Sequence, residues 1–266
     1  MKKQFIIVIA GVVIVGILAA LLVLGRKPDG AHLGAQKGYI KEADMAFLNG
    51  DLLQARKLYE QAREKVDDTA GLKEIQKKIE DINIKVLFSP IMDKCAKKYT
   101  VKPNDSLAKI AKENNTTIEL IKRANNITSD IIRPDQGLKV NTCKFSIVVD
   151  KSQNILFLKV GNEIVKTYVV STGKNNSTPV GVFKIINKQP NPTWFRAGAV
   201  VPPDSPENIL GTRWLGFELK GYGIHGTTMP EDLGKQVTLG CVRMRNDEVE
   251  ELYDIVPVGT EVTIVD

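Results

Sequence analysis

The sequence predicts a multidomain chain: an N-terminal transmembrane helix, a short α-helical segment, a small βααβ module and a mainly-β C-terminal domain. Three observations lead to this prediction. The 266 residues are enough for two or three small domains. Residues 5–24 form one uncharged apolar run, and the hydrophobic spacing changes from helical to alternating after residue 144. With 43% hydrophobic and 26% charged residues, the composition is that of a folded protein.

The first 27 residues are expected to anchor the chain in a membrane. Twenty apolar residues, each rising about 1.5 Å in a helix, cover the roughly 30 Å hydrocarbon core of a bilayer. The run is longer than the apolar core of a signal peptide, is followed by no convincing cleavage site and contains no Cys for lipidation. Basic residues flank both ends and orient the helix only weakly. We therefore predict an uncleaved single-pass anchor, with everything after Lys27 on one side.

The net charge and the spacing of charged and metal-binding residue types indicate which ligands and partners the chain can bind. The chain has 37 Lys and Arg against 31 Asp and Glu, a net charge of +6, which favours an anionic membrane surface or cell-wall polymer. The basic residues are spread along the chain without interleaved aromatics, so no nucleic-acid partner is expected. The sequence has no cluster with metal-ligand spacing, and we expect no metal and no cofactor.

Residues 28–90 are predicted to form a linker and a helical hairpin. Residues 28–35 are interpreted as the linker, and residues 36–87 have helical spacing that is broken once, at Gly50-Asp51. Ala46 to Asp51, followed by Ala55, Leu58 and Tyr59, resembles a tetratricopeptide hairpin. Such repeats need about three copies for a continuous core, and here there are fewer than two. A spacer is expected; the alternative is a docking site for a protein partner.

Residues 95–143 are predicted to fold as strand, helix, helix and strand. A short β-like run covers residues 99–102, Ser106 and Thr117 are N-cap residues for two short helices, and Leu138 to Val140 forms the closing strand. These residues, with Asn125 and Pro134, resemble a LysM domain. The resemblance implies binding of glycans that contain N-acetylglucosamine, mainly peptidoglycan. The alternative is a module that serves only as a spacer or packing unit.

The chain contains three cysteines. An odd number outside the cytosol suggests one disulfide and one free thiol, whereas a cytosolic protein would keep all three reduced. The terminal strands of a LysM domain lie side by side, and Cys95 and Cys143 flank them. The resemblance therefore implies a Cys95–Cys143 disulfide and leaves Cys241 free.

Residues 144–266 are predicted to form a mainly-β domain of about 120 residues, large enough for its own core. Two of its strands are joined by Gly161-Asn162, a recognisable hairpin turn. One helix is expected over residues 247–256. Strands are expected at 145–149, 155–160, 163–170, 182–187, 213–218, 221–224 and 261–265.

Cys241 and His225 are candidates for a nucleophile and its base. His32, the other histidine of the chain, falls in the predicted linker. A cysteine nucleophile needs a group that takes its proton and donors that hold the oxyanion. One His and one Cys are by themselves a weak signal, and a buried histidine with an inert cysteine is the alternative. Glycines beside both residues, Gly226 and Gly240, leave backbone open to a substrate.

The surrounding motifs resemble the L,D-transpeptidase catalytic domain of the YkuD type. The resemblance runs from about Phe145 to Asp266 and departs at Leu239, where the family commonly has a basic residue; this leaves the substrate preference open but not the nucleophile. The motifs are His225-Gly226-Thr227, Thr238, Gly240-Cys241-Val242-Arg243-Met244, Ser171-Thr172-Gly173 and Thr178-Pro179-Val180-Gly181.

The resemblance implies a peptidoglycan L,D-transpeptidase that forms 3→3 cross-links or attaches another amine acceptor. Cys241 would attack the carbonyl between the third residue of a stem peptide and the following D-alanine, with His225 as base and then acid. The backbone N–H of Gly240, with that of Cys241, would hold the oxyanion. The alternatives are an L,D-carboxypeptidase and a non-catalytic peptidoglycan-binding protein.

The same resemblance suggests substrate-binding residues and a location. Arg243 is expected to meet a substrate carboxylate or to pair with Asp247 or Glu248, and Thr238 to bond near the thiolate or to cap a turn. Gly226 and Thr227 are further substrate-binding candidates. With the anchor, the resemblance implies a bacterial cell-membrane protein whose catalytic domain lies on the extracytoplasmic side.

Overall fold

The computed structural model describes residues 30–66, 68–196 and 198–266. The chain divides into two compact units, Met1–Val86 and Leu87–Asp266. The predicted membrane anchor, residues 1–27, lies outside the described residues. Within the described part of the chain, no helix has the length and hydrophobicity needed to span a bilayer.

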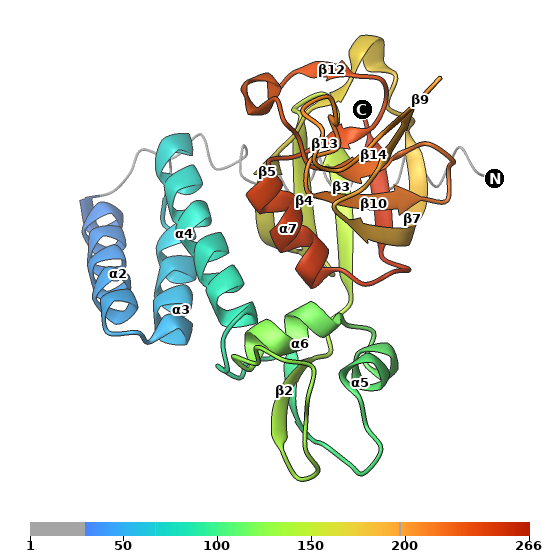
Figure 1. Ribbon diagram of the computed structural model, residues 1–266. Helices are drawn as coiled ribbons and strands as arrows, with labels where there is room; N and C mark the ends of the chain where they lie inside the picture. Colours follow the sequence, from blue (N-terminus) through green and yellow to red (C-terminus); the bar gives the residue numbers. More distant parts are fainter. Residues whose placement is uncertain (1–29, 67, 197) are drawn as a thin grey trace, which may run out of the picture. The chain divides into compact units, whose positions relative to one another are not determined.

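The first unit contains helices α2 (Gly30–Leu48), α3 (Leu52–Arg63) and α4 (Thr69–Leu87) (Figure 1). The linker prediction is wrong for residues 30–35, which begin α2; a glycine costs a helix only about 1 kcal/mol relative to alanine. The chain also breaks a second time, before α4, where the carboxylate of Asp68 accepts the Gly71 N–H at 2.7 Å. Three helices therefore stand where a hairpin was predicted, because this capping carboxylate was not recognised as a helix start.

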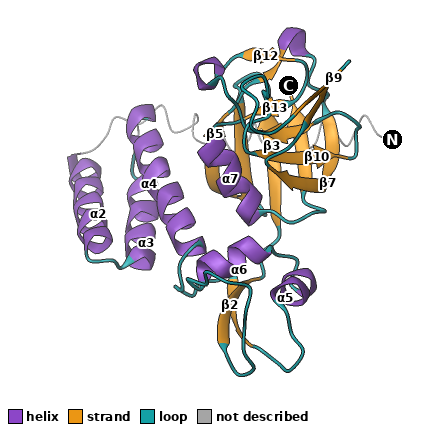
Figure 2. Ribbon diagram, in the orientation of Figure 1, coloured by secondary structure: helices purple, strands orange, loops and turns teal. Residues whose placement is uncertain are grey.

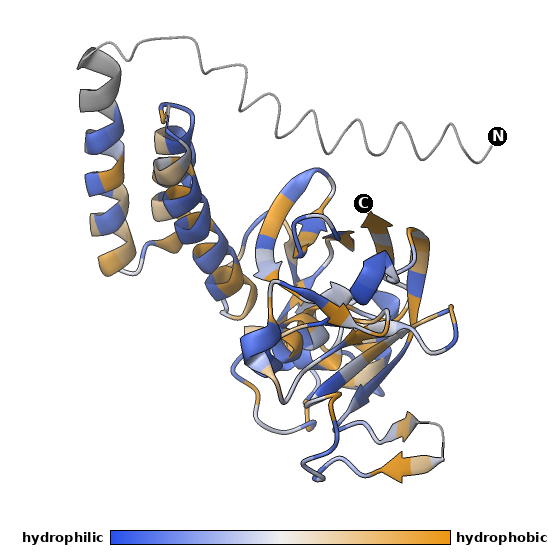
Figure 3. Ribbon diagram, turned by 90° about the horizontal axis from the view of Figure 1, so that it is seen from above, coloured by the Kyte–Doolittle hydropathy of each residue, from blue (hydrophilic) through white to orange (hydrophobic). Residues whose placement is uncertain are grey.

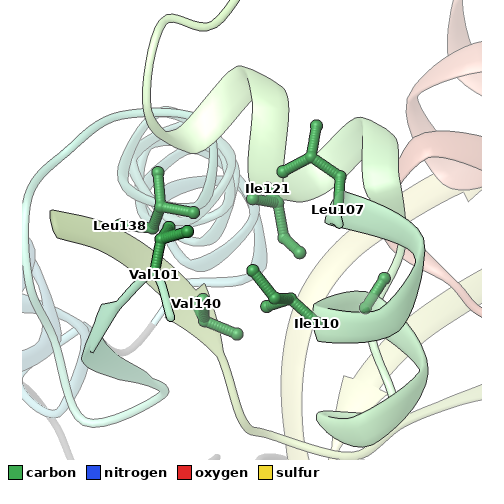
Figure 4. Close-up of a cluster of buried hydrophobic side chains, with 7 residues drawn as sticks. Val101, Leu107, Ile110, Ile121, Leu138 and Val140 are labelled. Carbon is green, nitrogen blue, oxygen red and sulfur yellow. The ribbon is translucent and has the colours of Figure 1, made fainter. Parts of the chain in front are cut away.

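The predicted LysM module, residues 95–143, contains β1 (Ala96–Thr100), α5 (Leu107–Glu113), α6 (Ile118–Ala124) and β2 (Gly137–Asn141). The strands pair antiparallel, and Ser106 and Thr117 cap the two helices as predicted. The Cys95–Cys143 disulfide is formed at the ends of the paired strands, which confirms that prediction. Apolar side chains from α5, α6, β2 and the residue after β1 make one core: Val101, Leu107, Ile110, Ala111, Ile121, Leu138 and Val140 (Figure 4).

The C-terminal domain, residues 144–266, is built on an eight-stranded sheet. Its strands are drawn in orange in Figure 2. Alternate residues of β3, such as Ile147 and Val149, are fully buried, as the period of a strand requires. The strands lie in the order β13 (Val242–Arg243), β11 (Gly223–His225), β10 (Arg213–Phe217), β7 (Gly181–Pro190), β14 (Glu261–Val265), β3 (Phe145–Asp150), β4 (Ile155–Val160), β5 (Glu163–Val169). Helix α7 (Asn246–Ile255) contacts β10 and β11 through a face that buries Val249, Leu252 and Ile255.

Five short strands escaped the sequence prediction because two or three residues carry no readable alternation. They are β6 (Thr172–Gly173), β8 (Trp194–Arg196), β9 (Ala199–Val201), β12 (Gln236–Thr238) and β13. Strands β8 and β9 form a projecting hairpin whose paired Phe195 and Val200 are 74% and 66% exposed (Figure 3).

Candidate active site

Adjacent parallel strands bring Cys241 and His225 together. Strand β11 pairs with β13 so that Ile224 faces Val242 and His225 faces Arg243. Both Ile224 and Val242 are fully buried, and side chains alternate along a strand. His225 and Arg243 therefore share the opposite face, and Cys241, the residue before β13, lies two positions from Arg243. The register therefore places the predicted nucleophile and base at the same edge of the sheet.

His225 is held as a neutral base. Its Nδ1 lies 2.7 Å from the Gly226 carbonyl oxygen, which can only accept a proton, so Nδ1 carries the hydrogen and Nε2 is left to take one. The imidazole stacks on Trp214, with ring centroids 6.0 Å apart. The pKa of His225 is lowered to about 4, mainly by burial; the charge of Arg243 acts in the same direction, and the Gly226 hydrogen bond opposes it.

The Cys241 thiol is partly exposed and protonated at neutral pH. Burial raises its pKa, while a hydrogen bond from the Gly223 backbone and the charge of Arg243 act in the opposite direction. The thiol donates to the Gly221 carbonyl oxygen at 3.4 Å. If Cys241 is the nucleophile, as predicted, a neutral thiol has to give up its proton during the attack.

A tight turn presents Cys241. Gly240 has a φ of +130°, and a Cβ there would lie 2.7 Å from the Tyr222 ring, so only glycine fits without displacement. The Thr238 hydroxyl donates to the Cys241 carbonyl at 2.6 Å and accepts the Gly240 N–H at 3.2 Å. Thr238 thus closes the turn, the second of its expected roles. The Gly240 N–H is already bonded to the Thr238 hydroxyl, so it would have to release that oxygen before it could bind an oxyanion. The role of Gly240 in holding the oxyanion therefore stays a prediction.

Asn246 organises the loop that follows His225. Its carboxamide oxygen accepts the N–H groups of Thr227 at 2.9 Å and of Thr212 at 3.3 Å, and its NH₂ donates to the Thr227 carbonyl at 2.9 Å. A Cβ at Gly226 would lie 2.2 Å from that oxygen, so the close approach requires glycine. Gly226 and Thr227, predicted to bind substrate, are both buried: the Gly226 carbonyl contacts His225, and the Thr227 backbone bonds Asn246.

Arg243 is buried beneath the site. Its Nη1 lies 3.8 Å from the Asp232 carboxylate, while Asp247 pairs with Arg245 at 3.0 Å. The expected alternative of a pair with Asp247 or Glu248 is therefore wrong, because the side chain points to the η2 turn (Pro230–Asp232) rather than along α7. Arg243 Nε is buried and has no hydrogen-bond partner among the described residues, and its expected contact with a substrate carboxylate stays a prediction.

The Ser171-Thr172-Gly173 motif lies against the nucleophile turn. Strand β6 pairs parallel with β12, which places Gly173 opposite Thr238. A Cβ at Gly173 would lie 3.0 Å from the Gly240 Cα and 2.6 Å from the Thr178 N, so the two motifs touch through backbone. Motifs that are some 70 residues apart in the sequence thus form one structure.

Three residues at the site went unpredicted: Trp214, Tyr222 and Asn246. Trp214 lies on β10, and Tyr222 lies just before β11. Their proximity in the sequence to the glycine-rich His225 motif was the signal that could have identified them. Asn246 follows Cys241 by five positions, at the start of a predicted helix, where an Asn side chain commonly binds backbone. Among the described residues, no group of three or more His, Cys, Asp and Glu side chains is placed to hold a metal ion.

A thiol at the same sheet edge as a neutral imidazole that is oriented by a carbonyl is the arrangement expected of an enzyme with a cysteine nucleophile. The sequence profile of the L,D-transpeptidase catalytic domain (YkuD) matches residues 144–264, and the LysM profile matches residues 99–141. The candidate L,D-transpeptidase YqjB of Bacillus subtilis is 43% identical over 126 residues, which cover 45% of this chain and 70% of that protein. The chain belongs to the L,D-transpeptidase family and is an acyltransferase.

Two further similarities show how far the relationship extends. The candidate L,D-transpeptidase YkuD of Bacillus licheniformis is 36% identical over 174 residues, 62% of this chain and 97% of that protein. A solved L,D-transpeptidase from Mycobacterium smegmatis is 21% identical, with a TM-score of 0.39, and the match covers 50% of this chain and 64% of that one. The structural similarity is too low to support a functional argument, so the family assignment depends on the sequence relatives.

Proposed function

We propose that this protein cross-links peptidoglycan stem peptides by a 3→3 bond, through a thioester on Cys241. The placement of Cys241 and His225 on one face of two paired strands supports this most directly. The family resemblance supplies the substrate: a stem peptide whose third residue is joined to a D-alanine.

In the acylation step, Cys241 Sγ attacks the carbonyl carbon while His225 Nε2 takes the thiol proton. The C–N bond then breaks, the same proton passes to the departing D-alanine amine, and a thioester remains. Donors at the Gly240–Cys241 turn stabilise the oxyanion, a contribution that typically amounts to 100-fold or more in rate for each donor.

In the second step, the side-chain amine of a neighbouring stem peptide attacks the thioester. It loses a proton to Nε2 of His225, and the Cys241 thiolate leaves and recovers that proton. Water in place of the amine would give an L,D-carboxypeptidase with the same two residues.

The rest of the chain is proposed to keep the enzyme at its substrate. The apolar residues 5–24 support a single-pass anchor that leaves the catalytic domain on the extracytoplasmic side, and the LysM match supports peptidoglycan binding. A tether and a weak glycan contact together raise the effective concentration at the wall. Fractionation of cells, followed by protease treatment of intact spheroplasts, tests this location; a protein that stays in the soluble fraction contradicts it.

Mass spectrometry of purified disaccharide-tetrapeptide fragments tests the activity. Wild-type protein is expected to release D-alanine and form 3→3 dimers, and Cys241→Ala is expected to form neither. Trimmed monomers without dimers would favour the carboxypeptidase, and unchanged fragments with retained binding to intact wall would favour a non-catalytic binder.

A further inference from the structure

The LysM module and the catalytic domain are joined by a very short connection. Strand β2 ends at Asn141 and β3 begins at Phe145, which leaves three residues between the two folds. Two of these are fixed: the Thr142 N–H donates to the Cys95 carbonyl at 2.8 Å, and Cys143 is bonded to Cys95. The connection therefore has little freedom, unlike an ordinary flexible linker.

Helix α6 of the LysM module is bonded to the end of helix α7. The Thr117 hydroxyl caps α6 by accepting the Leu120 N–H at 2.9 Å, and it donates to the Asp254 carbonyl oxygen. The Arg123 guanidinium lies 2.8 Å from the Asp254 carboxylate, whose side chain is 18% exposed. A capping residue and a salt bridge of one short helix thus converge on one residue of the catalytic domain.

The same contact surface is incompletely closed. A cleft of about 380 Å³ lies beside it, lined by Lys112 and Glu119 from the LysM module and by Lys188, Pro257 and Val258 from the catalytic domain. The Lys188 ammonium donates to the Tyr253 carbonyl at 2.6 Å and is attracted by Glu119. The Arg123–Asp254 salt bridge is therefore a charged part of this contact, and reversing the charge of Asp254 is expected to weaken the contact.

Helix α7 connects this contact to the active site. Asp254 lies near its C-terminal end, and Asn246, which holds the loop after His225, is its first residue. Ten helical residues span about 15 Å, so a short rigid element separates the LysM contact from the base.

We propose that the Thr117–Asp254 and Arg123–Asp254 contacts are a positioning device: they hold Cys241 in a fixed orientation to the glycan strand that the LysM module binds. The proposal rests on the proposed function and goes further than tethering. A tether raises the reaction rate on any nearby stem peptide. A fixed orientation instead favours stem peptides at one particular distance from the bound glycan strand. Arg123 and Asp254 are accordingly positioning residues for polymeric substrate and play no part in the chemistry.

The test uses charge reversal and a charge swap in the full-length protein. In Asp254→Arg, two cations face each other across the contact, and a cation near the C-terminus of α7 suits the helix dipole, so the helix itself is retained. The double variant Arg123→Asp with Asp254→Arg restores the attraction. Each protein is assayed on soluble disaccharide-tetrapeptides and on intact peptidoglycan sacculi, and sedimentation with the sacculi measures binding.

Asp254→Arg is expected to lose about fivefold or more in the cross-linking rate on sacculi. Its rate on soluble fragments and its sedimentation with sacculi should stay within about twofold of wild type, and the double variant should recover the rate on sacculi. An equal loss on both substrates, or no loss on either, overturns the positioning proposal. A wild-type protein that cross-links neither substrate overturns the proposed function instead.

Discussion

At the scale of single residues, the base of this site is defined by what surrounds it. His225 is buried against Trp214, and the Gly226 carbonyl binds its Nδ1. Burial therefore keeps the imidazole neutral far below the pH at which an exposed histidine is charged. A neutral base beside a neutral thiol implies general-base catalysis rather than a preformed ion pair.

The pH dependence of the reaction follows from this state. Because the pKa of His225 is lowered to about 4, the base form persists as the pH falls through 6.5, and activity should be lost only near pH 4. A profile of kcat/KM against pH on soluble fragments measures this directly. An acid limb centred near 6.5 would contradict it and would indicate an exposed imidazole.

Asn246 is expected to affect turnover although it does not touch the reacting atoms. Asn246→Ala leaves the buried Thr227 N–H without a partner, which costs about 1–3 kcal/mol, and frees the loop that orients His225. We expect kcat to fall at least about tenfold. Asn246→Asp keeps both accepted hydrogen bonds, so its kcat should lie between the values of wild type and Asn246→Ala.

Arg245→Ala is the control for Asn246, because the neighbouring Arg245 makes an exposed pair with Asp247. Its kcat should match that of wild type. The thermal midpoint of each variant separates a loss of fold from a loss of positioning, and an Asn246→Ala protein with unchanged kcat would exclude the positioning role.

At the scale of elements, the turn before β13 sets the place of the nucleophile. Gly240→Ala combines a φ of +130° with a contact 2.7 Å from the Tyr222 ring, so the turn must move and take Cys241 with it. We expect a loss of about 100-fold in kcat/KM on soluble fragments. Gly161→Ala is the matched control: its φ is also positive, at +56°, but its Cβ would have open space at a hairpin far along the chain. If both variants lose activity equally, the loss is caused by lower global stability rather than by movement of the Cys241 turn.

The disulfide is expected to stabilise the LysM module. The bond closes a separation of 48 residues in a unit with one small apolar cluster. Replacing both cysteines, Cys95→Ser with Cys143→Ser, should lower the stability of the module by about 2–5 kcal/mol and leave the rate on soluble fragments unchanged.

Alkylation followed by mass spectrometry checks the pairing itself. Without reductant, only Cys241 should be labelled in the wild-type protein. Labelling of Cys95 and Cys143 under the same conditions would show that the pair is not oxidised in the isolated protein.

At the scale of the whole molecule, the buried base makes stability depend on pH. His225 has a lower pKa in the folded state than in the unfolded state, so the unfolded chain binds more protons between pH 6.5 and about 4. The contribution of neutral His225 to the free energy of unfolding is complete above pH 6.5 and is lost as the pH falls toward 4. Glu248, whose pKa is raised by burial, acts in the opposite direction.

The comparison of wild type with His225→Gln isolates the histidine. Urea unfolding at pH 7 and pH 4.5, followed by a probe in the catalytic domain, should show a smaller pH dependence in the variant. Equal pH dependence in both proteins would show that His225 does not contribute.

The sequence determined the elements whose signals are local. Alternating apolar residues predicted the long strands of the catalytic domain, capping residues predicted α5 and α6, and the His225 and Cys241 motifs predicted the two central groups of the site. Each of these depends on neighbouring residues, which a sequence displays directly. The short strands and the break before α4 were missed because two or three residues, or one capping carboxylate, give too weak a pattern.

Only the tertiary structure decided which distant groups meet. It placed Asp232 rather than Asp247 beside Arg243, engaged the Gly240 N–H with Thr238, and made Asn246 the support of the His225 loop. It also fixed α6 of the LysM module to Asp254 of α7. These contacts depend on strand order and on the packing of α7, which arise from non-local burial, and the one-dimensional spacing of residues does not encode their geometry.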